Sequence, residues 1–149
     1  MPILETARFA LPLLAAGQAQ KELFHNEALI LVDFLLNPVV ESIVSDPQSL
    51  NPQAGQSWLV GADPEAEWSG YEDHIAGWSA NGWIFIKPFD FLEISISASG
   101  VTAVYRGSWQ IPEVVVDPTG GQVVDIEARN AIDSVLQILR ERGFFAAGS

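Results

Sequence analysis

The sequence predicts an α+β domain: an N-terminal helix, a central antiparallel sheet of β-hairpins and a C-terminal helix packed on that sheet. Three observations predict this class. Apolar residues recur with helical spacing near both ends of the chain, and from Ser57 onward their period changes to two, as in strands. The chain has 149 residues, 48% of them hydrophobic, which fits a single domain over residues 1–149 with a substantial core.

The first 45 residues are predicted to hold an arm and a helical region. Residues 1–16 are apolar and contain Pro2 and Pro12, so we interpret them as an extended arm that docks on another surface. Residues 18–45 are predicted to be helical. The clear helix covers residues 18–36, Asn37-Pro38 ends it, and residues 39–45 add a helical turn.

Residues 57–111 are predicted to form antiparallel hairpins. Asn81-Gly82 is a strong signal for a two-residue turn, which places Trp78 opposite Phe85. One face of this hairpin then holds Trp78, Trp83 and Phe85, and the other holds Ile75, Ile84 and Ile86. Since neither face is polar, the hairpin is either buried on both sides or presents an aromatic platform on one.

A second hairpin is predicted to turn at Ser99-Gly100, which separates an apolar face from a polar face and sets Glu93 opposite Arg106. Gly107-Ser108 is a third candidate turn, and it places Trp109 opposite Arg106, where a guanidinium can lie over an indole.

The last element is a helix over residues 125–142. Asp125 is a good N-cap residue, and Gly143 fits the position just beyond the C-cap. Between sheet and helix, Pro112 and residues 118–121 form a linker. The predicted buried stripe of the helix comprises Ala128, Ala131, Ile132, Val135 and Leu139.

Charge and composition exclude several function classes. The formal net charge is −12, so the chain has no basic footprint for nucleic acid or an anionic membrane surface. No apolar run reaches the roughly 20 residues of a membrane span. Glu5 accompanies Arg8 ahead of the apolar stretch at residues 9–16, so the basic start of a signal peptide is missing. We therefore expect synthesis in the cytoplasm without a signal peptide.

The sequence predicts no catalytic residues and no cofactor. It lacks cysteine and the common nucleophile, phosphate-binding and zinc motifs. Asp73 and His74 are weak metal candidates without a third ligand, and no loop spacing specifies calcium. The alternative to a non-enzymatic protein is a small glycan hydrolase. Its carboxylates would come from the acidic, tryptophan-containing loop at residues 62–74, namely Glu65, Glu67, Glu72 and Asp73.

Aromatic residues give the stronger functional signal. Trp58 and Trp83 are predicted core residues, whereas Trp68 and Trp109 have polar neighbours that suit partly exposed stacking positions. Binding pockets combine aromatic walls with a few polar groups. The candidate glycan-binding residues are therefore Trp68, Tyr71, Trp78, Arg106 and Trp109.

Several motifs resemble those of one known family. They are the run Leu11-Pro-Leu-Leu-Ala-Ala-Gly-Gln-Ala-Gln-Lys-Glu22 with residues 25–29, Trp58-Leu-Val-Gly61, Trp68-Ser-Gly70, Ile75-Ala-Gly-Trp78, Asn81-Gly-Trp83, and the closing residues 123–129. They resemble a domain-of-unknown-function family found in prophage and gene-transfer-agent proteins of alphaproteobacteria. The resemblance covers nearly the whole chain. The acidic loop departs from it, because relatives look richer in glycine and alanine there.

The resemblance implies a virion-associated tail-fibre or head-spike component. Such a protein would bind a host surface polysaccharide or dock the fibre on other virion proteins. It would be a homo-oligomer, with a trimer as one arrangement by analogy with fibres. A purely structural oligomerisation module is the remaining alternative, and the resemblance carries over no catalytic residue.

Overall fold

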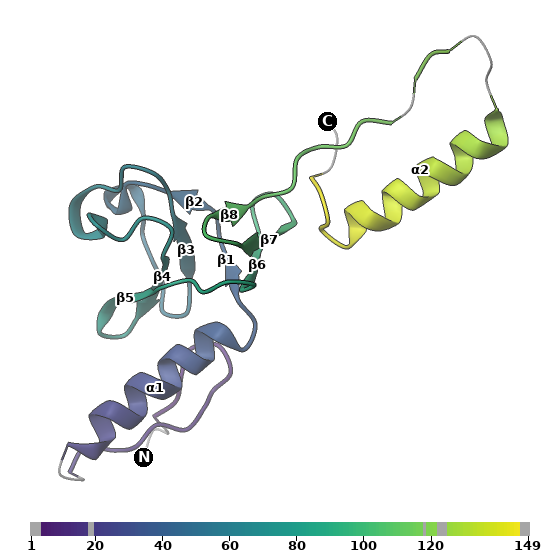
Figure 1. Ribbon diagram of the computed structural model, residues 1–149. Helices are drawn as coiled ribbons and strands as arrows, with labels where there is room; N and C mark the ends of the chain where they lie inside the picture. Colours follow the sequence, from purple (N-terminus) through teal and green to yellow (C-terminus); the bar gives the residue numbers. More distant parts are fainter. Residues whose placement is uncertain (1–3, 18–19, 118, 122–124, 147–149) are drawn as a thin grey trace.

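The described part of the chain contains two α-helices, eight strands and two short 3-10 helices (Figure 1). The computed structural model describes residues 4–17, 20–117, 119–121 and 125–146. The α+β class is confirmed. The elements are α1 (Lys21–Leu35), β1 (Val39–Val40), β2 (Ile43–Val44), η1 (Pro47–Ser49), β3 (Ser57–Val60), η2 (Ala66–Trp68), β4 (Ile75–Ser79), β5 (Gly82–Ile86), β6 (Glu93–Ile96), β7 (Val101–Tyr105), β8 (Trp109–Gln110) and α2 (Ile126–Glu141).

The strands form two mixed sheets, with orders β1-β6-β7-β8 and β2-β3-β4-β5. The pairs within residues 57–111 are antiparallel, as predicted, and the parallel β1–β6 and β2–β3 pairs make each sheet mixed. The predicted helical turn at residues 39–45 is wrong, because these residues form β1 and β2. Pro38 disfavours continuation of α1. The β-branched residues that follow form β1 at the edge of one sheet and β2 at the edge of the other. Gln18 and Ala19, predicted to start the first helix, lie outside the described residues.

Both predicted hairpins exist, but their turns lie elsewhere. In the β4–β5 hairpin Trp78 pairs with Trp83, so Ala80-Asn81 is the connection and the predicted Asn81-Gly82 turn is wrong. Gly82 takes the left-handed conformation at φ +106°, and the Ser79 hydroxyl donates to its carbonyl oxygen at 2.9 Å. Because the register moves by two, the predicted division into an aromatic and an isoleucine face is confirmed.

In the β6–β7 hairpin Ile96 pairs with Val101, so the connection spans residues 97–100 and not the predicted Ser99-Gly100 turn. The reason lies in β1: the backbone N–H groups of Ser97 and Ala98 donate to the carbonyls of Val40 and Glu41, each at 2.9 Å. The hairpin end is thereby held by the neighbouring edge strand, and the predicted opposition of Glu93 and Arg106 is lost.

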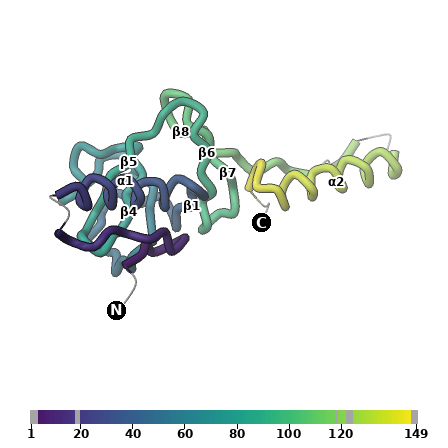
Figure 2. The backbone as a smooth tube through the Cα atoms, turned by 90° about the horizontal axis from the view of Figure 1, so that it is seen from below, coloured from purple at the N-terminus to yellow at the C-terminus, as the bar shows by residue number. Residues whose placement is uncertain are grey.

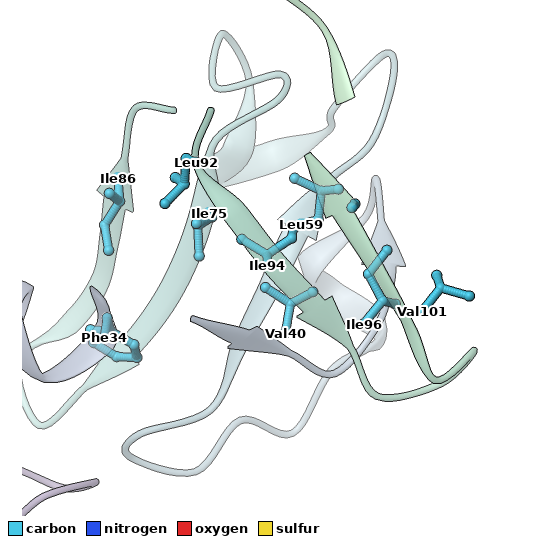
Figure 3. Close-up of a cluster of buried hydrophobic side chains, with 10 residues drawn as sticks. Phe34, Val40, Leu59, Ile75, Ile86, Leu92, Ile94, Ile96 and Val101 are labelled. Carbon is cyan, nitrogen blue, oxygen red and sulfur yellow. The ribbon is translucent and has the colours of Figure 1, made fainter. Parts of the chain in front are cut away.

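The main hydrophobic core lies where the two sheets and α1 meet (Figure 3). Phe34 enters it from α1, and Gly77 of β4 leaves room for the Phe34 ring. A Cβ atom at Gly77 would lie 2.7 Å from Phe34 Cζ, so only glycine fits this contact without movement. The buried members are Phe34, Val40, Leu59, Ile75, Ile86, Leu92, Ile94, Ile96, Val101 and Ala103.

A second, aromatic cluster covers the opposite face of the β2-β3-β4-β5 sheet. Trp83 is its centre, with edge-on contacts to Trp58 at 5.7 Å, Trp68 at 5.0 Å and Trp78 at 4.8 Å between ring centroids. The predicted core positions of Trp58 and Trp83 are confirmed, with Trp58 buried and Trp83 half-buried. The β4–β5 hairpin is therefore covered on both faces.

The N-terminal arm docks on its own chain. Its residues fold back on themselves through a bridge between Glu5 and Pro12. Buried Asp33 of α1 holds the arm: its carboxylate accepts hydrogen bonds from the Thr6 hydroxyl at 2.6 Å and from the backbone N–H groups of Arg8 at 2.9 Å and Phe9 at 2.8 Å. A carboxylate suits this place because it only accepts.

Arg8 completes the anchor of the arm. Its guanidinium donates to the carbonyls of Gly55, Phe34, Asn37 and Val39 and to the Ser57 hydroxyl, and it lies 4.7 Å above the Phe34 ring. The carbonyls of Phe34 and Asn37 lie at the end of α1, where a cation is favourable. Burial lowers the pKa of Arg8, while the charges of Asp33 and Glu41 act in the opposite direction.

The C-terminal helix does not pack on a sheet, and that part of the prediction is wrong. Helix α2 has no buried residue and projects from the sheets in both views (Figures 1 and 2). Its ends follow the predicted capping: the Asp125 carboxylate accepts from Ala128 N–H at 2.9 Å, and Gly143 takes a φ of +72°. The helix lies instead beside residues 111–117, an extended segment that we call the strap.

Candidate binding groove

A surface groove lies where the β1-β6-β7-β8 sheet meets the strap and the segment after α2. Its volume is about 710 Å³, within the range of small-ligand sites. The sheet contributes polar side chains, and the strap and the C-terminal segment contribute mostly apolar ones. The lining residues are Glu93, Thr102, Val104, Arg106, Gln110, Ile111, Pro112, Arg142 and Phe144.

The C-terminal wall of the groove is fixed by backbone hydrogen bonds. Gly143 and Phe144 N–H donate to the carbonyls of Arg140 at 2.9 Å and Leu139 at 3.0 Å, which is the pattern of a Schellman motif at the end of α2. The carbonyl of Gly143 accepts from Thr102 N–H at 2.8 Å. This bond ties the end of α2 to β7 and holds Phe144 at the groove.

Arg106 is the one predicted site residue that lines this groove. It does not lie over Trp109 as predicted, because β8 begins after a three-residue connection and pairs Trp109 with Tyr105. The Arg106 guanidinium instead lies 5.2 Å above the ring of exposed Phe91. This contact orients the guanidinium while leaving its N–H groups available, and no ion pair joins Arg106 to Glu93, both of which are described.

Trp109 connects β8 to the acidic loop. Its indole packs edge-on against Tyr105, with ring centroids 5.3 Å apart, and its Nε1 donates to the Asp73 carbonyl at 2.8 Å. The side chain is half-buried against the main core. The indole N–H is thereby occupied within the protein, so Trp109 supports the structure between β8 and the acidic loop.

The remaining predicted aromatic residues lie in or beside the tryptophan cluster and do not line the groove. Trp68 is fully buried, so the prediction that it is partly exposed is wrong. Half-buried Trp78 lines a separate cavity of about 130 Å³ beneath the N-terminal arm. Tyr71 is 38% exposed and has one ring face stacked on Phe85, with centroids 3.7 Å apart.

The acidic loop is spread over the surface beside the tryptophan cluster. Glu65, Glu67 and Glu72 are exposed, and the His74 ring contacts the Glu72 carbonyl through Nδ1 at 2.9 Å. Within the described residues, no group of three or more histidine, aspartate or glutamate side chains is arranged to hold a metal ion. Among the described helices, none has the length and apolar content of a membrane span.

Sequence reasoning missed most of the groove. Glu93, Thr102, Gln110, Arg142 and Phe144 were not predicted as site residues, although they lie beside Arg106 in the structure. The polar face of the β6–β7 hairpin was a usable signal for Glu93 and Thr102. No local pattern could show that residues after α2 return to β7, because that contact consists of long-range interactions: the Thr102–Gly143 backbone bond and the packing of Ala146 on the main core.

The fold and the groove define a small α+β domain that carries an open surface groove at its junction with a C-terminal helix. The chain belongs to the DUF2793 family, described as a protein of unknown function, whose sequence profile matches residues 25–110. The matched region runs from within α1 to the end of β8. No curated protein matches the chain.

Proposed function

We propose that this protein is a non-enzymatic component of a phage or gene-transfer-agent particle that binds a host surface glycan in the groove beside Arg106. The particle context comes from the resemblance of its motifs to prophage and gene-transfer-agent proteins of alphaproteobacteria. The groove carries the binding part of the proposal, because its volume of about 710 Å³ suits a small ligand and it contains a predicted glycan-binding residue.

The chemistry of the groove suits a sugar. Arg106, Thr102 and Gln110 supply hydrogen-bonding groups for hydroxyls, and Ile111 and Phe144 supply apolar surface for C–H faces. The polar groups come from the sheet, which fixes their spacing, whereas the apolar wall follows α2. Glycan binding here requires no metal and no catalytic pair.

The test is binding of fluorescently labelled protein to intact host bacteria, to bacteria stripped of surface polysaccharide, and to the isolated polysaccharide. We expect binding that depends on the polysaccharide. Arg106→Ala should weaken it at least about tenfold, equivalent to about 1.4 kcal/mol, because the truncated side chain loses its hydrogen bonds to the sugar.

Lys87→Ala is the matched control, since Lys87 is an exposed cation that does not line the groove. It changes the net charge by the same amount and should leave binding unchanged. Equal loss of binding in both variants would show that the effect comes from the change in net charge alone. Absence of binding to any of the three samples would exclude glycan recognition and leave docking on other particle proteins.

A further inference from the structure

Helix α2 presents an apolar stripe that no described part of the chain covers. Three large side chains on it are about half exposed or more: Ile132 47%, Val135 56% and Ile138 58%. Ala131 and Leu136 join Ile132 and Val135 around a shallow hollow of about 240 Å³ lined entirely by apolar residues. A continuous apolar face of this kind on a helix marks an interaction surface.

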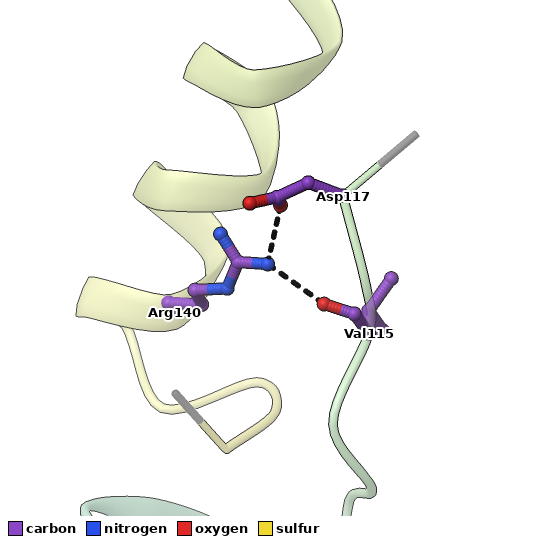
Figure 4. A network of polar contacts seen from close by, with 3 residues as sticks. All are labelled: Val115, Asp117 and Arg140. Carbon is purple, nitrogen blue, oxygen red and sulfur yellow. Dashed lines mark hydrogen bonds and ion pairs between the residues drawn. The ribbon is translucent and has the colours of Figure 1, made fainter. Parts of the chain in front are cut away.

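The strap occupies a different side of the helix. The Arg140 guanidinium donates to the Val115 carbonyl at 2.7 Å and forms an ion pair with Asp117 at 2.6 Å (Figure 4). Farther along, Arg129 donates to the Gly120 carbonyl. These contacts hold strap and helix together as one C-terminal arm, and half-buried Leu136 lies between the exposed stripe and Arg140 on the helix surface.

We infer that the stripe of α2 pairs with the same stripe of a second copy of this chain, with the two helices antiparallel. The charge distribution favours a second copy. Residues 126–142 carry equal numbers of acidic and basic side chains, whereas the whole chain carries −12. The helix is therefore a neutral surface on a strongly acidic molecule, and it is where two copies can meet without like-charge repulsion.

The antiparallel orientation follows from the polarity of the helix. Asp125 and Glu127 lie at its start, and Arg140 and Arg142 lie at its end. Antiparallel pairing sets the acidic start of one helix beside the basic end of the other, and it also opposes the helix dipoles. A parallel pair or trimer would instead bring together the acidic sheets, which adjoin the end of α2 through the Thr102–Gly143 bond.

The size of the surface sets the strength of the contact. A helix of 16 residues is about 24 Å long, so two such helices bury less than the roughly 1,200 Å² of a standard stable interface. We therefore expect a reversible dimer with a dissociation constant of about 10 μM or weaker. Many copies on one particle would raise the local concentration above this value.

Sedimentation equilibrium of the full chain from about 5 to 500 μM tests the pairing, because this range brackets the expected dissociation constant. The wild type should pass from monomer to dimer. Val135→Glu should remain monomeric, since it buries a charge at the centre of the stripe. The matched control is Asn130→Glu, which adds the same charge on another side of α2 and should dimerise like the wild type.

Cross-linking tests the antiparallel orientation of the two helices. Because the sequence contains no cysteine, only the introduced cysteines can form a disulfide. Antiparallel pairing about Val135 brings Ala131 near the partner's Leu139. A mixture of Ala131→Cys and Leu139→Cys chains should therefore form a disulfide-linked dimer under mild oxidation, while Ala131→Cys alone should not.

A wild type that is monomeric at all concentrations, a trimer, or efficient cross-linking of Ala131→Cys with itself would overturn the inference. Equal loss of dimer in Val135→Glu and Asn130→Glu would also overturn it, because the effect would then be charge alone. Circular dichroism of each variant verifies that α2 remains helical. Neither Val135 nor Asn130 lines the groove, so these results are independent of glycan binding.

Discussion

At the scale of single residues, Asp33 has the largest expected effect on stability. Its buried carboxylate accepts from three donors of the N-terminal arm. Asp33→Asn places an amide N–H₂ group against at least one of these donors, so a hydrogen bond becomes a repulsive contact. We expect the free energy of unfolding to fall by about 2–3 kcal/mol in urea denaturation.

Asp125→Asn is the control for this change, because asparagine serves equally well as an N-cap. Its unfolding free energy should stay within about 0.5 kcal/mol of the wild type. Limited trypsin digestion gives a second readout: cleavage after Arg8 should accelerate in Asp33→Asn only. An unchanged cleavage rate would mean that the arm is held mainly by the Arg8 guanidinium.

At the scale of elements, the contact between α1 and β4 depends on the absence of a side chain at Gly77. Gly77→Ala puts a methyl group within 2.7 Å of the Phe34 ring, which must push α1 away from the sheet. We expect a loss of about 1–3 kcal/mol in thermal or urea unfolding, the range for overpacking.

The double variant Gly77→Ala/Phe34→Ala separates this clash from other effects of alanine in a strand. In the Phe34→Ala background the new methyl group enters the space left by the ring, so Gly77→Ala should become neutral or stabilising. A loss of the same size in both backgrounds would show that the α1 contact is not the cause.

Hairpin faces were predictable from the sequence, whereas registers were not. Alternation fixes which residues share a face, and a shift of two residues preserves that, as in the pairing of Trp78 with Trp83. The turn position depends on tertiary contacts, such as the bonds from Ser97 and Ala98 to the edge strand β1. Trp68 was placed wrongly because its sequence neighbours are polar, while its ring packs on distant Trp83.

The candidate site was predicted less well than the fold. Arg106, a predicted site residue, lines the groove, but its neighbours Arg142 and Phe144 come from beyond α2. The predicted stripe of α2 shares Ala131, Ile132 and Val135 with the exposed stripe in the structure, but the prediction that it is buried on the sheet is wrong. Amphipathicity shows that a helix has an apolar face and does not show what covers that face.

At the scale of the whole molecule, the region matched by the family profile is not the same as the unit that folds. A chain ending at Gln110 loses α2, which has no buried residue, and keeps nearly all of the main core. We expect it to retain its near-ultraviolet circular dichroism and to lose about 1 kcal/mol or less.

Deletion of residues 1–17 should have the opposite outcome, although this segment also lies outside residues 25–110. It removes the three donors of the Asp33 carboxylate and the Arg8 guanidinium with its hydrogen bonds to the end of α1 and to Ser57. We expect a loss of more than about 3 kcal/mol, the cost of breaking a buried charged network. Comparable melting temperatures for the two truncated chains would contradict the expectation that residues 1–17 stabilise the fold more than residues 111–149.

The parallel pairing of β1 also bears on how the chain folds as it leaves the ribosome. Val39 pairs with Ser95, so β1 has no strand partner in its sheet until Ser95 has been synthesised. The other sheet is complete once Ile86 has emerged. Vectorial synthesis therefore leaves Val39 and Val40 as an unpaired apolar edge for much of translation, and the nascent chain is most open to misassociation in that interval.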